Sequence, residues 1–321
     1  MIPHQWYIVL ESREIQPNQI VGVTRFGERL VFWRSRDGEL VCLRDKCIHR
    51  GASLAIGKHH GDEIACPFHG FRYDKTGRVT LIPANGRSSE VASYFHIKRY
   101  PVREKLGWVF VWWGDSEPTH EPIYFDDVDE SLFWASSRHL WPVHYSRAIE
   151  NQLDLVHLPF VHTNTIGRGN RTLVNGPVQV VREGDIAFWV YNEVDHGQKP
   201  KKAEDLPHPD FSHQHIHFIF PNMWQNYISD KMRILVAFVP VDESHTLIYL
   251  RIAQKFIRLP LLRELVNSLA LGFSKVVLHQ DERVVITQIP IATQLHMEEK
   301  LIPGDLPIIT YRQMREKLKK L

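Results

Sequence analysis

The sequence predicts an α+β protein of two domains, in which an all-β N-terminal domain is followed by a domain with helices against an antiparallel sheet. Three observations lead to this prediction. The chain has 321 residues, enough for two domains of ordinary size. Up to Trp113 it consists of short strand-like segments punctuated by Gly and Pro, whereas longer apolar runs follow. Between these parts the polar segment 114–122 lacks periodicity, so we expect a linker there and domains of 1–114 and 115–321.

The elements of the first domain are all expected to be strands. Alternating apolar and polar residues, bounded by turn-forming residues, predict strands over 19–26, 29–34, 40–43, 63–65, 79–81 and 108–113. Segments this short, separated by Gly, Asp-Gly and Pro, are typical of a small all-β domain.

The elements of the second domain are expected to be strands and helices. We predict strands over 178–183, 186–193, 213–220, 233–240 and 246–254, and helices over 146–158 and 261–287. This order favours an antiparallel sheet with helices packed against it. No internal repeat or low-complexity tract is visible.

The composition excludes several classes of protein. With 43% hydrophobic and 24% charged residues, the chain resembles a globular protein rather than a disordered or fibrous one. Its 3 cysteines allow at most one disulfide, which excludes a disulfide-stapled secreted scaffold. A net charge of +2 gives no electrostatic argument for a nucleic-acid or membrane partner. Without a signal peptide or a bilayer-spanning apolar segment, we expect a soluble, cytoplasmic protein.

Two motifs in the first domain each supply one thiolate and one imidazole. They are Cys47-x-His49 and, after 16 intervening residues, Cys66-x-x-His69. Two such loops can place both sulfurs on one iron of an Fe2S2 cluster and both imidazoles on the other, which raises the cluster's reduction potential. The pattern therefore predicts an electron relay. A tetrahedral zinc site is the alternative, although zinc modules tend to pair Cys with Cys and His with His.

A second set of candidate ligands lies near the predicted helix 146–158. Asp154 and His157 are three residues apart and share a helix face. On a continuous helix His162 would point away from that face. However, Pro159 disfavours helical geometry at Leu158, so the chain can turn and the two imidazoles can converge. In a chain with 19 histidines, two unrelated histidines remain the alternative.

Together these motifs resemble those of the Rieske non-haem iron oxygenases. The Cys and His pairs of the first domain are similar to the Rieske iron–sulfur motif. In the second domain, Asn151-x2-Asp154-x2-His157-x4-His162 resembles the mononuclear-iron motif of the terminal oxygenase α-subunits, which include ring-hydroxylating and phthalate-type demethylase members. The resemblance covers both halves of the chain and implies a helix-grip type of catalytic domain.

The resemblance implies a Rieske [2Fe-2S] cluster, a mononuclear Fe(II) and O2 as co-substrate. A carboxylate late in the chain should complete the two-His, one-carboxylate iron site, and in the matching stretch 279–285 we assign Asp281. Glu282 is the alternative ligand, and the solvated face of a helix is the alternative interpretation of both acids.

The resemblance also implies roles for two residues beside the iron ligands. Asp154 is expected to bridge an iron-ligand imidazole, that of His157, and a cluster-ligand imidazole of a neighbouring subunit, which implies a homotrimer. Asn151, one turn before Asp154, is expected either to touch substrate or O2 or to satisfy a helix backbone group.

The function implied by the resemblance is that of a terminal oxygenase component that hydroxylates or oxidatively demethylates a small organic or aromatic substrate. The short chain favours monooxygenation or demethylation over ring dihydroxylation. Because no nicotinamide or flavin site is visible, electrons are expected from an NAD(P)H-dependent reductase, with or without a ferredoxin. The alternative is a Rieske electron carrier whose second domain binds a ligand without oxygen chemistry.

Candidate substrate residues lie on and after the strand predicted over 213–220. Period-two alternation places His213, His215 and His217 on one face. That face lines a pocket in one interpretation and is an exposed polar face in the other. The segment 223–226, which ends at Asn226, is expected to form part of the cavity mouth.

Overall fold

The computed structural model describes residues 1–167, 173–181, 187–199, 201, 205 and 214–320. The chain divides into two compact units, residues 3–122 with Met1 and residues 123–321 with Ile2. The division falls at the end of segment 114–122, where we expected the linker.

Three antiparallel sheets make up the N-terminal unit, which confirms the prediction of an all-β domain. The strand order of the first sheet is β1 (Gln5–Glu11), β11 (Trp108–Trp113), β10 (Val102–Lys105). That of the second is β2 (Ile20–Arg25), β3 (Glu28–Arg34), β4 (Leu40–Arg44), β9 (Arg99–Tyr100). That of the third is β5 (Lys58–His59), β6 (Ile64–Ala65), β7 (Arg72–Tyr73), β8 (Val79–Leu81). Two short 3-10 turns, η1 (Ser12–Glu14) and η2 (Pro83–Asn85), complete the unit.

Strand β3 shows how the sequence builds the core of this unit. Its residues Val31 and Trp33 belong to one buried cluster, whereas Leu30 and Phe32 belong to another. Successive side chains of a strand point to opposite faces, so a strand with both faces buried is apolar throughout. The run of four large apolar residues in β3 is therefore required by its position between the two clusters.

The three cysteines are all buried, but in different clusters. Cys47 and Cys66 lie in the same cluster as Trp33, so both ligand motifs rest on packed apolar side chains. Cys42 lies in the other cluster and is fully buried, which raises the pKa of its thiol. Cys42 is therefore a packing residue of this core.

The second unit is organised around a seven-stranded antiparallel sheet, which confirms the predicted antiparallel sheet and adds two strands to the five predicted ones. The strand order is β12 (Phe133–Trp141), β18 (Thr246–Gln254), β17 (Met232–Pro240), β16 (Met223–Ser229), β15 (His215–Ile219), β14 (Ala187–Val194), β13 (Leu173–Val181). Strands β13 to β18 follow one another in chain order, and β12 joins the sheet at its edge beside β18.

Two strands of this sheet, β12 and β16, were not predicted. The middle of β12 is Ser136-Ser137-Arg138-His139, which breaks the apolar alternation expected of a strand, yet β12 pairs with β18 over nine residues. Residues 223–226, which we expected at a cavity mouth, form the first half of β16 and pair with β15 and β17. In both strands, long-range pairing outweighs a weak local pattern.

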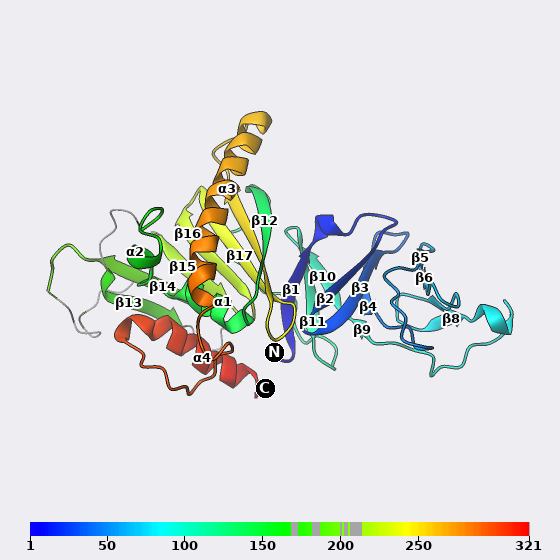
Figure 1. Cartoon of the computed structure of the whole chain (residues 1–321). Coiled ribbons are helices and arrows are strands. Elements are labelled where there is room, and N and C mark those ends of the chain that lie inside the picture. The colour runs from blue at the N-terminus through cyan, green and yellow to red at the C-terminus, as the bar shows by residue number, and fades with distance from the viewer. Residues whose placement is uncertain (168–172, 182–186, 200, 202–204, 206–213, 321) are drawn as a thin grey trace. The chain divides into compact units, whose positions relative to one another are not determined.

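The described residues of this unit form the helices α1 (Tyr145–Leu153), α2 (Leu158–Val161), α3 (Pro260–Val285) and α4 (Leu306–Leu318), the last preceded by the 3-10 turn η4 (Pro303–Asp305). Figure 1 shows α3 running across the sheet, and it contacts β12 and β18. Helix α4 was not predicted. In the described part of the chain, no helix combines the length and apolarity needed to cross a membrane.

The helix predicted over 146–158 is wrong in its last turn. Helix α1 ends at Leu153, because Asp154 has extended backbone angles (φ −80°, ψ 112°). Leu158 is helical, so the break is not the one we expected before Pro159. Pro159 instead lies in the first turn of the short helix α2, where its missing N–H group costs no hydrogen bond.

Buried charges hold α1 against the C-terminal part of the chain. Arg312 of α4 donates to both carboxylate oxygens of Glu150 (2.9 and 2.7 Å) and to Glu299 (2.7 Å). Arg147 donates to Glu299 (2.8 Å) and to the carbonyl of Pro290 (2.8 Å). Since buried charges are stable only when paired, this network fixes the helix from whose C-terminal end several site residues come.

Candidate metal centres and adjoining pocket

The first ligand loop, residues 47–52, is closed by two backbone hydrogen bonds. The N–H of Cys47 donates to the carbonyl of Ala52 (2.8 Å), and the N–H of Gly51 donates to the carbonyl of Cys47 (2.8 Å). Gly51 has φ of +73°, a conformation that glycine adopts without strain.

The second ligand loop, residues 66–71, repeats this pattern. The N–H of Cys66 donates to the carbonyl of Phe71 (2.8 Å), and the N–H of Gly70, whose φ is also +73°, donates to the carbonyl of Cys66 (3.1 Å). Two loops of the same shape therefore each present one Cys and one His.

The four candidate cluster ligands lie in pairs. The two cysteine side chains are hydrogen-bond neighbours and are each 3% exposed, and burial, followed by the contact with Cys47, raises the pKa of the Cys66 thiol. The rings of His49 and His69 are exposed and lie 4.6 Å apart. Two adjacent buried thiols resist double ionisation unless a cation neutralises them, so this donor set fits a metal cluster with its sulfur side inside and its imidazole side at the surface.

Tyr73 supports this centre and was missed by the sequence analysis. Its hydroxyl oxygen accepts a hydrogen bond from the N–H of Ile48 (3.0 Å) and lies 3.0 Å from the sulfur of Cys47. Because that oxygen already accepts from an N–H, its own proton is available to Cys47. Burial, and then the contact with Cys47, raise the pKa of Tyr73 far above its usual value. No local signal distinguishes this tyrosine from the nine others.

The second candidate centre is formed by His157, His162 and Asp281. The two Nε2 atoms are 3.3 Å apart, and Oδ1 of Asp281 lies 3.3 Å from His157 Nε2 and 2.9 Å from His162 Nε2. For metal–ligand bonds of about 2.1 Å, neighbouring octahedral ligands are about 3.0 Å apart, so the three atoms have the spacing of one octahedral face. One ligand atom from each of the three residues lies within 4.8 Å of the others.

Asp281, rather than Glu282, is the carboxylate at this centre. Asp281 is 2% exposed and faces the two imidazoles, whereas Glu282 faces His279 (3.5 Å). The structure thus brings together Asp281 and two histidines that are more than a hundred residues away in the sequence.

The charges of this group are those of a cation site. Oδ1 of Asp281 is buried and makes no hydrogen bond within the described structure. Burial opposes ionisation of Asp281, but His157 and His162 hold the pKa of its carboxyl below the usual value. Burial likewise lowers the pKa of His157, but Asp154 and Asp281 outweigh it and raise that pKa to about 9. A divalent metal ion bound to these atoms would take the place of the proton, so the residues fit a metal.

The other ring nitrogen of each histidine of this centre faces a polar side chain. Nδ1 of His162 donates to Oε1 of Gln280 (2.9 Å), which leaves the Nε2 lone pair free for the centre. Nδ1 of His157 faces Oδ2 of Asp154 at 3.8 Å. The other oxygen of Asp154 accepts from the N–H groups of Val156 (2.9 Å) and His157 (3.2 Å), which fixes this carboxylate in the turn after α1.

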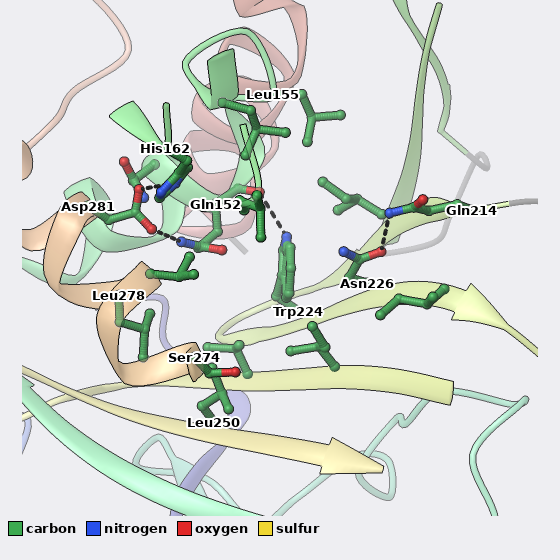
Figure 2. Close-up of a pocket in the computed structure, with 18 of the residues that line it drawn as sticks. Gln152, Leu155, His162, Gln214, Trp224, Asn226, Leu250, Ser274, Leu278 and Asp281 are labelled. Carbon is green, nitrogen blue, oxygen red and sulfur yellow. Dashed lines mark hydrogen bonds and ion pairs between the residues drawn. The ribbon is translucent and has the colours of Figure 1, made fainter. Parts of the chain in front are cut away.

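A cavity of about 880 Å³ adjoins this centre (Figure 2). Its lining is mainly apolar and comes from residues 151–166, from strands β15 to β18 and from α3. Amide side chains are the main polar exceptions, and they are those of Asn151, Gln152, Gln214 and Asn226. The buried Nδ2 group of Asn151 makes no hydrogen bond within the described structure. The cavity therefore offers apolar surface and neutral polar groups next to three candidate metal ligands.

The predicted substrate residues are distributed unevenly around this cavity. His215 lines it and stacks on Tyr227 (4.7 Å between ring centres), and Asn226 also lines it. His217 is not among the lining residues and packs against Phe125 (5.1 Å). With 8% and 9% exposure, His215 and His217 show that the exposed-face interpretation is wrong for these two residues. His213 lies outside the described residues.

The expectation of a cavity mouth at 223–226 holds only for alternate residues. Trp224 and Asn226 line the cavity, whereas Met223 is buried elsewhere and Gln225 donates to Asp127 (3.1 Å). This alternation follows from the strand geometry of β16, which the sequence analysis did not predict.

Two family models match the chain. The model described as Rieske [2Fe-2S] domain matches residues 5–101, and the one described as vanillate O-demethylase oxygenase C-terminal domain matches residues 141–321. The first match favours an iron–sulfur cluster over the alternative zinc site.

Individual relatives agree with these matches. The chain is 34% identical over 165 residues to the chloroplastic chlorophyllide a oxygenase of Chlamydomonas reinhardtii (51% of this chain, 25% of that protein). It is 29% identical over 187 residues to the vanillate O-demethylase oxygenase subunit of Pseudomonas sp. (57% and 51%). The matched part thus spans about a quarter to a half of these relatives. The structure of Pseudomonas putida CBB5 NdmA with caffeine is similar in fold, with a TM-score of 0.80 at 22% identity (99% and 91% covered).

Proposed function

Since the chain belongs to the Rieske oxygenases whose second domain is of the vanillate O-demethylase oxygenase type, we propose that it is a terminal oxygenase component. The proposed reaction is hydroxylation or oxidative demethylation of a small organic substrate. The observation that carries the proposal is the buried group of His157, His162 and Asp281 beside the cavity, in a chain that also carries a Rieske motif.

We assign the electron-relay role to the first centre. The proposed domains are 1–114, which carries this centre, and 115–321, which carries the second. Cys47, Cys66, His49 and His69 would hold the [2Fe-2S] cluster. Because the thiols are buried and the imidazoles exposed, electrons from a reductase or ferredoxin would enter at the imidazole side.

The second centre would hold Fe(II), which when bound supplies the open coordination positions at which O2 is activated. In the hydroxylation, one oxygen atom of O2 would enter a substrate C–H bond and the other would leave as water. The cluster would supply the electrons and solvent the protons. Oxidative demethylation is the same step at a methyl group, after which the hydroxymethyl group leaves as formaldehyde. His157, His162 and Asp281 would hold the metal beside the cavity.

The cavity residues would bind and orient the substrate. Apolar side chains from the sheet and α3 exclude water and hold an apolar body, while Asn151, His215 and Asn226 offer hydrogen bonds to its polar groups. A substrate role for His213 remains a prediction from the sequence, and the structure gives no support for one at His217.

The relay would be completed between subunits of a homotrimer, with Asp154 as the bridge. Its Oδ2 faces the imidazole of His157, and its Oδ1 is held by backbone N–H groups, so the carboxylate is fixed in position for a second imidazole. The electrons would come from a separate NAD(P)H-dependent reductase, with or without a ferredoxin.

The alternative, a Rieske electron carrier with a non-catalytic second domain, is not favoured by the comparisons or by the buried ligand group. Iron content tests the two. An oxygenase should hold about three irons per chain and a carrier about two. Changing His162 to Ala should remove one iron, leave the visible spectrum of the cluster unchanged and abolish O2 uptake with a competent reductase. Wild-type protein with two irons and an intact cluster would refute the oxygenase proposal.

A further inference from the structure

The two carboxylate oxygens of Asp281 have different surroundings. Oδ1 faces the Nε2 atoms of His157 and His162 and makes no hydrogen bond in the described structure. Oδ2 accepts a hydrogen bond from the side-chain amide of Gln152 (3.3 Å), as Figure 2 shows. Gln152 thus makes contact with the oxygen that does not face the imidazoles.

Gln152 is itself held in place through its backbone. Its backbone carbonyl accepts a hydrogen bond from the indole N–H of Trp224 (2.9 Å), which is buried on β16 (Figure 2). Gln152 lies in the last turn of α1, and that helix is tied to α4 through Glu150 and Arg312. The amide therefore approaches Asp281 from a backbone fixed at two points.

We propose that Gln152 is a positioning residue that occupies one oxygen of Asp281, so that only the other oxygen is offered to the metal. A carboxylate can bind a metal through one or two oxygens. A hydrogen bond to Oδ2 stabilises negative charge there and opposes the rotation that would bring both oxygens to the metal. With a single carboxylate oxygen and two imidazoles bound, three of six positions stay open, whereas a second oxygen would block one of them. This inference rests on the proposed function, because it assumes a metal at this centre.

The experiment compares the same substitution at two glutamines of the same cavity. Gln152→Met removes the amide at nearly constant volume. Gln214→Met is the matched control, because Gln214 lines the cavity but donates to Asn226 rather than to Asp281. Each full-length protein, with its cluster intact, is stripped of mononuclear iron and titrated with Fe(II) against a competing chelator. The electron paramagnetic resonance signal of the reloaded iron with nitric oxide is then recorded with the cluster oxidised.

We expect Gln152→Met to change the shape of the resonance signal, because both oxygens of Asp281 are then free to bind, and to change the affinity for Fe(II) by about 10-fold. Gln214→Met should match the wild type in both measurements. Gln152→Asn, which keeps the amide but is one methylene shorter, should behave like Gln152→Met and serves as a second variant if the first folds poorly. Circular dichroism and the cluster absorbance establish folding.

Two negative results have different meanings. If the wild type takes up iron at this centre but Gln152→Met and Gln152→Asn show wild-type affinity and signal shape, the role of Gln152 is refuted and the proposed function stands. If the wild type takes up no iron there, the proposed function fails, and the inference fails with it.

Discussion

The hydroxyl group of Tyr73 contacts two adjacent residues of the first ligand loop. Tyr73 accepts from the N–H of Ile48 and lies within hydrogen-bond distance of the Cys47 sulfur. Hydrogen bonds to cluster sulfurs favour the more negative, reduced state and so raise the reduction potential. At the same scale, Gln280 and Gln152 each contact one candidate iron ligand, so single amides determine which ligand atoms face the centre.

Changing Tyr73 to Phe is expected to lower the reduction potential of the cluster. If the lost hydrogen bond favours the reduced state by about 1.4 kcal/mol, the shift is roughly 60 mV for one electron. Redox titration followed by circular dichroism measures it. Tyr94→Phe is the control, because Tyr94 is 75% exposed. The reduction potential of the cluster should not change in this variant. An unchanged potential in a cluster-loaded Tyr73→Phe protein would contradict the assigned hydrogen bond.

Helix α1 is the element on which the second centre depends. Its C-terminal turn supplies Asn151 and Gln152, and its end leads directly to Asp154 and His157. At its start, Nδ1 of His144 accepts a hydrogen bond from the N–H of Ser146 (3.3 Å), so His144 caps the helix in its neutral form. Burial, followed by the charge of Arg315, lowers the pKa of His144 to about 4.

This cap predicts a dependence of stability on pH. The pKa of His144 is lower in the folded protein than its unfolded value of about 6.5, so the unfolded chain binds a proton more readily. The contribution of His144 to the free energy of unfolding is complete above pH 6.5. It decreases as the pH falls from 6.5 to 4 and changes no further below 4. Between pH 7 and pH 5 the loss is roughly 2 kcal/mol.

His144→Asn tests this dependence, because asparagine caps a helix but does not titrate in this range. Urea unfolding at pH 7 and pH 5 should show a smaller loss of unfolding free energy in the variant than in the wild type. Equal losses in both proteins would show that His144 does not titrate as the structure indicates.

At the scale of the whole molecule, the two units carry separate chemistry. The N-terminal unit contains the candidate ligands for an electron relay, and the second unit contains the buried group of His157, His162 and Asp281 and the cavity. An oxygenase needs both centres, and the bridge proposed for Asp154 would connect the second centre of one subunit with the first centre of its neighbour. The expected assembly is a trimer with three times the chain mass of 37.6 kDa.

Changing Asp154 to Asn is expected to separate these two chemistries. Asparagine retains an oxygen that can accept from Val156 and His157, so the turn and the iron content should persist. The negative charge beside His157 is lost, and turnover should fall by at least about 10-fold. Single-turnover kinetics of cluster oxidation, with light scattering to establish the trimer, provide the measurement. Full activity in a variant with about three irons per chain would exclude the bridging role.

Much of the fold follows from local patterns, but not all of it. The six strands predicted in the first domain are present, since short alternating segments between turn residues are largely local features. Strands β12 and β16 escaped prediction because their stability depends on partners distant in the sequence. Pro159 was misinterpreted because its effect depends on where α2 begins, and that is decided by Asp154.

The sequence by itself determined the ligand motifs, because each motif spans only a few residues. Each lies in a turn that is held by its own backbone hydrogen bonds. It also determined the two-domain class and, through the resemblance of both motifs, the family. Only the tertiary structure placed Asp281, and not Glu282, beside the two imidazoles, placed Gln152 and Tyr73 beside the candidate ligands, and separated His215 from His217. These outcomes depend on which face of a helix or strand is buried and against what, and that packing joins residues far apart in the chain.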